Sequence, residues 1–342
     1  KTPVILIANK CEGRSGQDGF YEAFELGLGD PVSISAEHGQ AIGDLIDAVR
    51  NAAATHDSGD EDGDTDKPLR LVVIGLPNAG KSTLINRLIG SERMLAGPEA
   101  GITRDAISID WDWKGKPVRL FDTAGLRRRS RVGEQSELLA RNDALRAIRF
   151  AEVVVLLVDS QQALDKQDLH LADLVAEEGR ALVIAANKGD LVGDRKAYAK
   201  ALRQAADNKL SQVRGAPIVL VSALEEWGLD TLLDESFAVA ENWNRRISTG
   251  ELNRWFSEII DRHPPPAVAG RRIRMRYITQ ASSRPPTFIV FCSRPDAIPD
   301  SYRRYIVNEL RSAFELPGVP VRIHLRKGRN PYVRGERGGS AD

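Results

Sequence analysis

A glycine-rich loop between an apolar strand and a helix limits the possible folds of this chain more than any other segment. The run Leu69–Ile74 leads into the loop GLPNAGKS, and a stretch with helical periodicity follows at Thr83–Ile89. In this context a G-x-x-x-x-G-K-S loop surrounds phosphates with backbone N–H groups, and the helix N-terminus adds its positive dipole end. We therefore predict a nucleotide site formed by Gly75, Asn78, Ala79, Gly80, Lys81, Ser82 and Thr83.

Short β-branched runs alternate with helical patterns around this loop. The predicted strands are Leu69–Ile74, Val118–Phe121, Val153–Val158, Ala181–Ala185 and Ile218–Val221. This alternation predicts an α/β P-loop NTPase fold over residues 68–244, with a mostly parallel sheet and helices on both faces. The segment Ile107–Trp113 alternates apolar and polar residues and is predicted to be an antiparallel edge strand.

Two loops at predicted strand ends indicate which base is bound. In Asn187-Lys188-Gly-Asp190 the carboxylate can accept two N–H groups from guanine, and adenine lacks that paired donor edge. Asn187 either bonds the purine or ties this loop to the phosphate loop. The backbone of Ser222-Ala223 is placed to contact the guanine oxygen. GTP and GDP are therefore the predicted ligands.

Two further segments supply candidate magnesium ligands and switch groups. Asp122-Thr-Ala-Gly125 follows a predicted strand, so Asp122 is placed to hold Mg²⁺ and the Gly125 N–H to sense the γ-phosphate. Thr103, in a loop between the two motifs, is the candidate second hydroxyl ligand. The predicted Mg²⁺ ligands are Ser82, Thr103 and Asp122, and the predicted catalytic groups are Lys81, Thr103 and Gly125.

Two details of these loops bear on hydrolysis. Leu126 stands where many related GTPases carry a Gln, so backbone groups, another residue or an ion must position the attacking water. Asn78 either binds a monovalent cation such as K⁺ beside the phosphates or makes a hydrogen bond within the loop. Both interpretations of Asn78 stay open.

From Asn244 onward the pattern changes. The order helix, strand, strand, helix, strand predicts a small α+β domain over residues 245–333, followed by a flexible tail, 334–342. Its predicted elements are Thr249–Arg262, Arg272–Thr279, Thr287–Cys292, Ser301–Phe314 and Val321–Arg326.

Charge is unevenly distributed although the net charge is zero. Residues 55–67 form a predicted acidic linker, whereas Arg245–Asp342 holds 19 Lys/Arg against 9 Asp/Glu. The basic surplus favours RNA contacts, and a solvated strand face is the alternative. The candidate RNA-contacting residues are Arg271, Arg272, Arg274, Arg276, Arg326 and Lys327.

Composition excludes several other classes. A hydrophobic content of 42% fits a globular protein, and no apolar run approaches the roughly 20 residues needed to cross a bilayer. The two cysteines give neither a disulfide framework nor metal-ligand spacing. We expect a cytoplasmic protein without a membrane partner.

The chain also contains an internal repeat. The stretch PVILIANKCE at residues 3–12 matches ALVIAANKGD at 181–190, and PVSISAEHG at 31–39 matches PIVLVSALEEWG at 217–228. Residues 1–54 are therefore predicted to be the C-terminal remnant of a first copy, without a phosphate loop. Its remnant base site comprises Asn9, Lys10, Glu12, Ser35 and Ala36.

The two copies, the acidic linker and the basic α+β domain resemble the double-Era-like GTPases (Der, also called EngA). The motifs GLPNAGKS, GITRD, DTAG, NKGD and SAL match the second GTP-binding domain of that family. The resemblance implies a KH-like C-terminal domain and K⁺-activated GTP hydrolysis. It also implies a role in assembly of the large (50S) ribosomal subunit, with that subunit and its rRNA as partners.

The leading hypothesis is thus a GTP-driven assembly factor, acting as a monomer. Two alternatives are a GTPase module of a tRNA-modification system and a GTP-gated scaffold with little turnover.

Overall fold

The computed structural model describes residues 4–11, 23, 31–37, 45, 48–49, 67–90, 108–121, 145, 147–267 and 272–327. Its contacts divide into two units, Lys1–Asn244 with Leu316–Pro320, and Arg245–Glu315 with Val321–Asp342. Several predicted site residues, together with the tail 334–342, lie outside the described ranges: Glu12, Thr103, Asp122, Gly125, Leu126 and Arg271.

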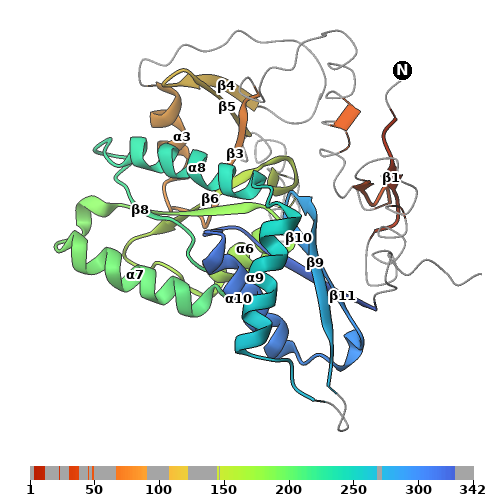
Figure 1. The fold of residues 1–342 in the computed structure, drawn as a ribbon. Coiled ribbons are helices and arrows are strands. Elements are labelled where there is room, and N and C mark those ends of the chain that lie inside the picture. Colours follow the sequence, from red (N-terminus) through yellow and green to blue (C-terminus); the bar gives the residue numbers. More distant parts are fainter. Residues whose placement is uncertain are drawn as a thin grey trace, which may run out of the picture. The chain divides into compact units, whose positions relative to one another are not determined.

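Most of the strands and helices are labelled in Figure 1. The strands are β1 (Ile7–Ala8), β2 (Val32–Ser33), β3 (Leu69–Gly75), β4 (Ser108–Trp113), β5 (Lys116–Phe121), β6 (Val153–Asp159), β7 (Ala181–Asn187), β8 (Ile218–Leu220), β9 (Met275–Ser283), β10 (Pro286–Cys292) and β11 (Arg322–Lys327). The helices are α3 (Lys81–Gly90), α6 (Lys166–Glu177), α7 (Arg195–Lys209), α8 (Leu229–Asn244), α9 (Thr249–Arg262) and α10 (Asp300–Ala313). Short 3-10 turns occur at Gly189–Leu191, Ser211–Val213 and Pro295–Ala297.

A six-stranded sheet with the order β4-β5-β3-β6-β7-β8 forms the centre of the first unit. All neighbouring pairs are parallel except β4 and β5, which are antiparallel. The predicted mostly parallel sheet with an antiparallel edge strand is thereby confirmed. Every residue of β7 is buried, as expected for a strand that has helices on both faces.

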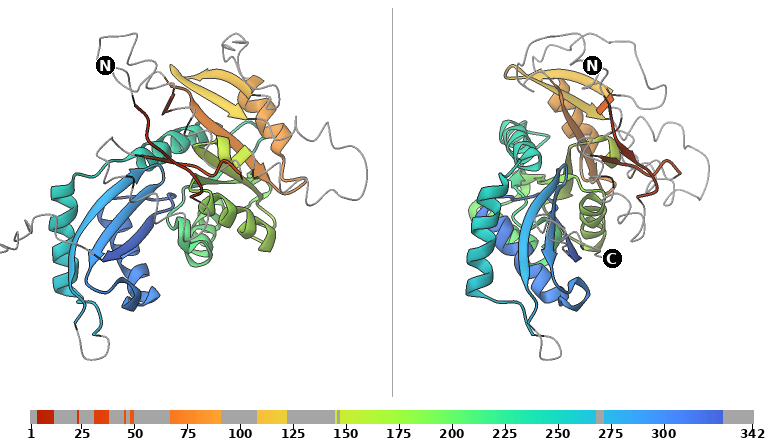
Figure 2. Two further views of the ribbon diagram at one scale, coloured as in Figure 1. Left: turned by 90° about the vertical axis from the view of Figure 1, so that its right-hand side faces the viewer. Right: turned by 45° about the vertical axis from the view of Figure 1, so that its right-hand side comes forward.

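Two apolar layers lie on opposite sides of this sheet. One contains Leu84 of α3 and Trp243 of α8, and the other contains Val175 of α6 and Leu202 of α7. The helices therefore cover both faces, as predicted (Figure 2). The parallel strands end at Gly75, Asp159 and Asn187, and this end of the sheet carries the phosphate loop and the base loop.

The chain returns to the first unit for five residues after α10. Within Leu316–Pro320, Leu316 and Val319 are fully buried, and the Leu182 N–H donates to the Gly318 carbonyl at 2.9 Å. Gly318 has φ +68°, and a Cβ there would lie 2.8 Å from the Leu182 carbonyl oxygen. This close approach beside the start of β7 requires glycine.

The second unit has the predicted α+β composition. Its sheet has the order β11-β10-β9, with β11 parallel and β9 antiparallel to β10. The Asn253 side chain of α9 bonds both the N–H and the carbonyl of Ile278, which satisfies two backbone groups of the edge strand β9. Gln280 accepts from the Ile247 N–H and donates to the Arg245 carbonyl, which fixes the segment before α9.

Strand β9 begins later than predicted. It starts at Met275 instead of Arg272, and its pairing with β10 skips Arg276, because Phe291 faces Tyr277 while Cys292 faces Met275. Arg276 is therefore the extra residue of a β-bulge, and regular alternation does not run through the arginine cluster.

The first copy keeps a short parallel pair, β1 with β2. The Val32 N–H donates to the Leu6 carbonyl, and the Ile34 N–H donates to the Ala8 carbonyl, each at 2.8 Å. Within the described ranges, no helix is both long and apolar enough to span a membrane.

Candidate nucleotide-binding site

The phosphate loop is built around three residues with positive φ. Gly75 and Gly80 have φ +153° and +97°, and Asn78 between them has φ 66°. A Cβ on Gly75 would collide with the Leu157 carbonyl oxygen, and one on Gly80 would collide with the Asn187 side chain. Both glycines are required because the loop passes so close to β6 and to the base loop.

Lys81 lies at the first turn of α3 and folds over this loop. Its Nζ donates to the carbonyl oxygens of Gly75 at 2.9 Å and Leu76 at 2.6 Å. Ser82 and Thr83 are exposed beside it on the same turn. A cation, hydroxyl groups and the positive end of a helix are thus gathered at one point, as binding of a phosphate chain requires.

Asn187 connects the base loop to the phosphate loop. Its Nδ2 donates to the Ala79 carbonyl at 2.8 Å, and its Oδ1 accepts from the Ala223 N–H at 3.0 Å. The side chain is 3% exposed. Of the two interpretations of Asn187, the structure therefore shows the one in which it connects the base loop to the phosphate loop. Its bonds bring together the loops that follow β3, β7 and β8.

Asp190 is held by a neighbouring loop. Its Oδ1 accepts from the Ser222 hydroxyl at 2.6 Å, and the same hydroxyl oxygen accepts from the Glu225 N–H at 3.1 Å. A carboxylate oriented in this way can present its other oxygen to two N–H groups of a purine edge. This is the donor pattern that guanine offers.

Lys188 connects the base loop to the end of β6. It has φ 62°, and its Nζ forms an ion pair with Asp159 Oδ2 at 2.5 Å. Burial acts to raise the pKa of Asp159, but hydrogen bonds from Lys188 and from the Gln161 N–H outweigh it and keep that pKa below its usual value. The pair holds the long lysine stem across the base loop, where it can form one wall of a purine pocket.

Sequence reasoning missed several residues that support this loop. Ser160 donates its hydroxyl to the Lys188 carbonyl at 3.0 Å, and Trp227 lies beneath Gly189, where an added Cβ would be 2.6 Å from its ring. The Arg195 guanidinium lies 4.2 Å from the centre of the Trp227 ring. No short motif marks these residues, because each acts on the backbone of another segment. The position of Asp159, the partner of Lys188, could have been noticed in the sequence, because it is an acidic residue at the end of an apolar strand.

The remnant base site has the same local geometry. Asn9 Oδ1 accepts from the Lys10 N–H at 2.8 Å and from the Ala36 N–H at 3.0 Å, and Lys10 has φ 61°. Ser35 is buried beside it, and Glu12 lies outside the described residues. Residues 1–54 contain no G-x-x-x-x-G-K-S sequence.

The candidate RNA-contacting residues lie along the second unit. Arg272 and Arg274, just before β9, and Arg276 within it are exposed. Arg326 and Lys327 end β11, where they are the register partners of Phe291 and Cys292 on β10. The described residues therefore bring these basic groups to one end of one sheet, and Arg271 lies outside them.

A phosphate loop on a parallel sheet, tied through Asn187 to a guanine-type base loop, defines a P-loop GTPase. Residues 70–188 match the family model described as 50S ribosome-binding GTPase, and residues 246–326 match the KH-domain-like C-terminal domain of EngA bacterial GTPases. The chain belongs to the GTPase Der family.

Close relatives extend this likeness over most of the chain. A GTPase Der from Nitrobacter hamburgensis is 53% identical over 344 residues, which cover 97% of this chain and 74% of the relative. A GTPase Der from Bradyrhizobium sp. (strain BTAi1 / ATCC BAA-1182) is 55% identical over 340 residues, with the same coverage. The chain thus binds GTP with Mg²⁺ and hydrolyses it, and the predicted fold class, a P-loop GTPase followed by a KH-like domain, is confirmed.

Proposed function

We propose that this GTPase acts in assembly of the large (50S) ribosomal subunit, with that subunit and its rRNA as partners. The observation that carries the proposal is the match of residues 70–188 to the 50S ribosome-binding GTPase model. The basic surplus of residues 245–342 supports it, because rRNA is a polyanion. The proposal includes a monomer that acts in the cytoplasm, which sedimentation and cell fractionation would test.

In the proposed cycle, the backbone N–H groups of the phosphate loop and Lys81 hold the β- and γ-phosphates of GTP. Ser82, Thr103 and Asp122 would hold Mg²⁺, which would supply positive charge to the phosphates. The γ-phosphate orders the segments around Thr103 and Gly125, and loss of that phosphate releases them. Affinity for the ribosomal subunit then depends on the bound nucleotide.

Asn78 is the proposed K⁺ ligand. It is exposed at the turn of the phosphate loop with φ 66°, and its side chain makes no hydrogen bond to another described residue. An amide oxygen there can bind a monovalent cation beside the phosphates and supply positive charge in the transition state. Such a cation also offers a way to position water without a Gln at Leu126.

The test is multiple-turnover hydrolysis of GTP and ATP in potassium and in sodium buffer, with and without 50S subunits. We expect GTP-specific turnover that potassium and the subunits both raise. Asn78→Ala should remove the potassium effect, while Asn86→Ala, the same change on the exposed side of α3, should keep it. Potassium stimulation that survives Asn78→Ala would refute the ion assignment.

Binding to the subunit needs a separate measurement. Co-sedimentation with 50S subunits should depend on GTP, and Ser82→Ala should lose that dependence because it lacks the Mg²⁺ hydroxyl. Equal co-sedimentation with GTP, GDP and no nucleotide would refute the switch. The tRNA-modification alternative and the low-turnover scaffold are not favoured by the relatives.

A further inference from the structure

The segment between β8 and α8 is closed by a tryptophan. The Ser222 N–H donates to the Trp227 carbonyl at 3.1 Å, and the Trp227 N–H donates to the Ser222 carbonyl at 3.3 Å. These bonds fold residues 222–227 into a small turn. Because the Ser222 hydroxyl also binds Asp190, the position of Trp227 bears on the carboxylate that we assign to the purine edge.

The indole ring of Trp227 fills the space that a side chain at position 189 would occupy. A Cβ on Gly189 would lie 2.6 Å from Cη2 of the ring and 2.8 Å from Leu220 Cγ. Gly189 is buried, and its N–H donates to the Val221 carbonyl at 2.9 Å. The ring and this bond therefore fix the backbone that leads directly into Asp190.

The face of the same ring carries a cation. The Arg195 guanidinium lies over the indole, 4.2 Å from the ring centre, which is within the range of a cation–π interaction. The indole N–H donates to the Glu225 carboxylate at 3.3 Å. The ring of Trp227 is thus held at its edge by Gly189, at its face by Arg195 and at its nitrogen by Glu225.

Arg195 stands where a positive charge is unfavourable for its own helix. It is the first residue of α7, whose N-cap Asp194 accepts from the N–H groups of Lys196 and Ala197. A helix N-terminus carries a partial positive charge, and the first turn of α7 contains no acidic residue that would offset the arginine. The negative face of the Trp227 ring gives this cation a favourable partner. A residue that opposes the dipole of its helix in this way points to a purpose outside the helix.

A second side-chain contact of the turn is weaker. Glu226, with φ 60°, forms an ion pair with Arg87 of α3, and the side chains are 49% and 43% exposed. Exposed pairs contribute little, because water and salt screen them. Among the contacts between described residues, Trp227 is therefore the principal side-chain anchor of this turn, besides its bonds to Asn187 and Asp190.

We propose that Trp227, held by Arg195, is a positioning residue for guanine recognition. Its ring keeps Gly189 and Ser222 in place, and these two residues orient the Asp190 carboxylate toward the N–H groups of the purine edge. The inference concerns the nucleotide specificity of the GTPase and does not depend on the ribosomal partner. It adds to the purine site two residues that act through Asp190.

The nucleotide that separates this role from general support is inosine diphosphate. Its base lacks the 2-amino group of guanine and is otherwise the same. A carboxylate that binds the 2-amino group makes a charge-assisted hydrogen bond to GDP that inosine diphosphate cannot offer. The phosphate loop meets the same phosphates in both nucleotides. Displacement of Asp190 should therefore weaken GDP binding more than binding of inosine diphosphate.

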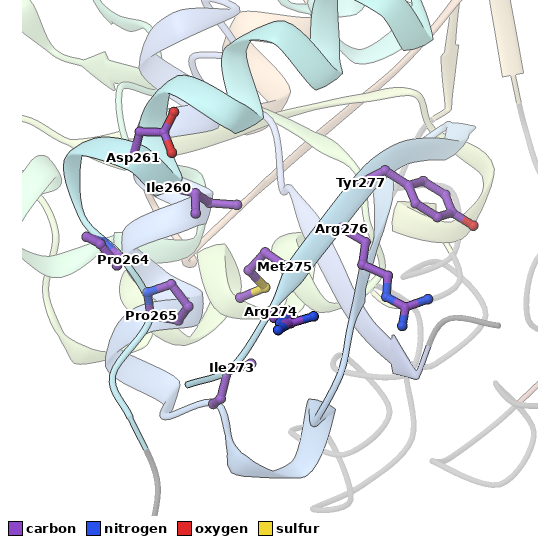
Figure 3. Close-up of a pocket in the computed structure, with 9 residues that line it drawn as sticks. All are labelled: Ile260, Asp261, Pro264, Pro265, Ile273, Arg274, Met275, Arg276 and Tyr277. Carbon is purple, nitrogen blue, oxygen red and sulfur yellow. The ribbon is translucent and has the colours of Figure 1, made fainter. Parts of the chain in front are cut away.

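The first experiment measures both affinities of the full chain by competition with a fluorescent GDP analogue. Trp227→Leu should lower the preference for GDP about tenfold, the scale of one hydrogen bond to a charged group. Trp227→Phe should retain more of the preference, because it keeps a ring beneath Arg195. The control is Tyr277→Leu, which removes a half-buried ring stacked on Phe291 in the second unit (Figure 3) and should keep the full preference.

The second experiment removes the cation at an exposed position, where the substitution leaves the core unchanged. Arg195→Gln should lower the preference for GDP about threefold, the scale of an exposed cation–π contact. Lys196→Gln removes the neighbouring exposed cation and should have no effect. In the Trp227→Leu background, Arg195→Gln should cause no further loss, because its partner is already gone.

Steady-state hydrolysis of GTP separates positioning from loss of folded protein. Trp227→Leu should raise KM and leave kcat near that of the unchanged chain, because the phosphate loop is not altered. A smaller fraction of folded protein would instead lower kcat at an unchanged KM. That result, with an unchanged preference for GDP, would overturn the inference.

Three other results would also overturn it. Equal weakening of GDP and inosine diphosphate by Trp227→Leu would mean that the ring supports the site without orienting Asp190. A full preference for GDP in Trp227→Leu would mean that the Ser222 hydroxyl orients the carboxylate without the ring. Additive losses in the Arg195 and Trp227 double variant would mean that the cation does not act through the ring.

Discussion

The two base loops of this chain, at Asn9 and at Asn187, share a local geometry in different surroundings. In each, the Asn Oδ1 accepts an alanine N–H at 3.0 Å, and the following lysine has φ near 60°. They differ in the burial of the asparagine and in the hydrogen bonds that its side chain makes. Asn187 is buried and its Nδ2 also bonds the Ala79 carbonyl of the phosphate loop, whereas Asn9 is exposed.

This difference shows which contact joins a base loop to a phosphate loop. The Asn-Lys turn needs only the neighbouring strand loop, because Asn9 makes it with the Ala36 N–H beside the short pair of β1 and β2. A purine pocket with its phosphates in register needs the second bond of Asn187, which joins segments 108 residues apart. Among the described residues, the Asn187 loop is thus the base loop that is bonded to a phosphate loop.

The largest expected effect comes from cutting that contact. Asn187→Ala leaves the Ala79 carbonyl and the Ala223 N–H without their partner. Because each such buried group costs about 1–3 kcal/mol, and 1.4 kcal/mol is tenfold in affinity, we expect GDP binding to weaken about 100-fold. Titration with a fluorescent GDP analogue measures it. Asn9→Ala is the matched control and should bind GDP like the unchanged chain. An equal loss of GDP affinity in both variants would contradict the difference drawn between the two base loops.

A smaller effect, on stability, tests the support that the segment 316–320 gives to β7. Gly318→Ala places a methyl group against the Leu182 carbonyl at φ +68°, so we expect unfolding of the first unit to become easier by about 2 kcal/mol. Urea denaturation followed by fluorescence of the buried Trp243 reports it. Gly193→Ala is the control, since nothing lies within 4 Å of an added Cβ there. Unchanged stability in Gly318→Ala would mean that the segment 316–320 does not support the sheet.

The next effect transfers a residue of the first copy into the second. Asp190→Glu gives the base loop the carboxylate of NKCE, one methylene longer, and disturbs the bond from the Ser222 hydroxyl. We expect about tenfold weaker GTP binding, the scale of one charge-assisted hydrogen bond. Competition between GTP and inosine triphosphate, which lacks the 2-amino group, should show reduced preference for GTP. An unchanged preference would mean that Asp190 does not contact the purine edge.

Much of the first unit follows from the sequence because its elements are set by local patterns. Continuous apolar runs identify β6 and β7, since parallel strands are buried on both faces, and the alternation before Trp113 identifies the edge strand. The phosphate loop is set by Gly75 and Gly80, whose backbone conformations few other residues adopt.

The features that could not be predicted from the sequence depend on contacts between distant segments. The return of Leu316–Pro320 to the first unit, the Asp159–Lys188 pair and the bulge at Arg276 have no local signature. The bulge is visible only once β9 is paired with β10.

The last expected effect concerns the electrostatics of helix α6, which packs against β6 and β7. Asp168 is 2% exposed and belongs to the capping box with Asp165. Burial first, and then the charge of Asp165, raise the pKa of Asp168 to about 6. The unfolded chain releases this proton near its ordinary pKa of 3.8, so between these values the folded state binds more protons.

Stability should therefore fall by roughly 3 kcal/mol as pH rises from about 4 to about 6, and then remain level with respect to this group. Asp168→Asn, which stays neutral, should lose that slope and be more stable than the unchanged chain at pH 7. Urea midpoints across this pH range measure the slope. Asp173→Asn, an exposed position on the same helix, should keep it. An identical slope in Asp168→Asn would assign the pH dependence to another group.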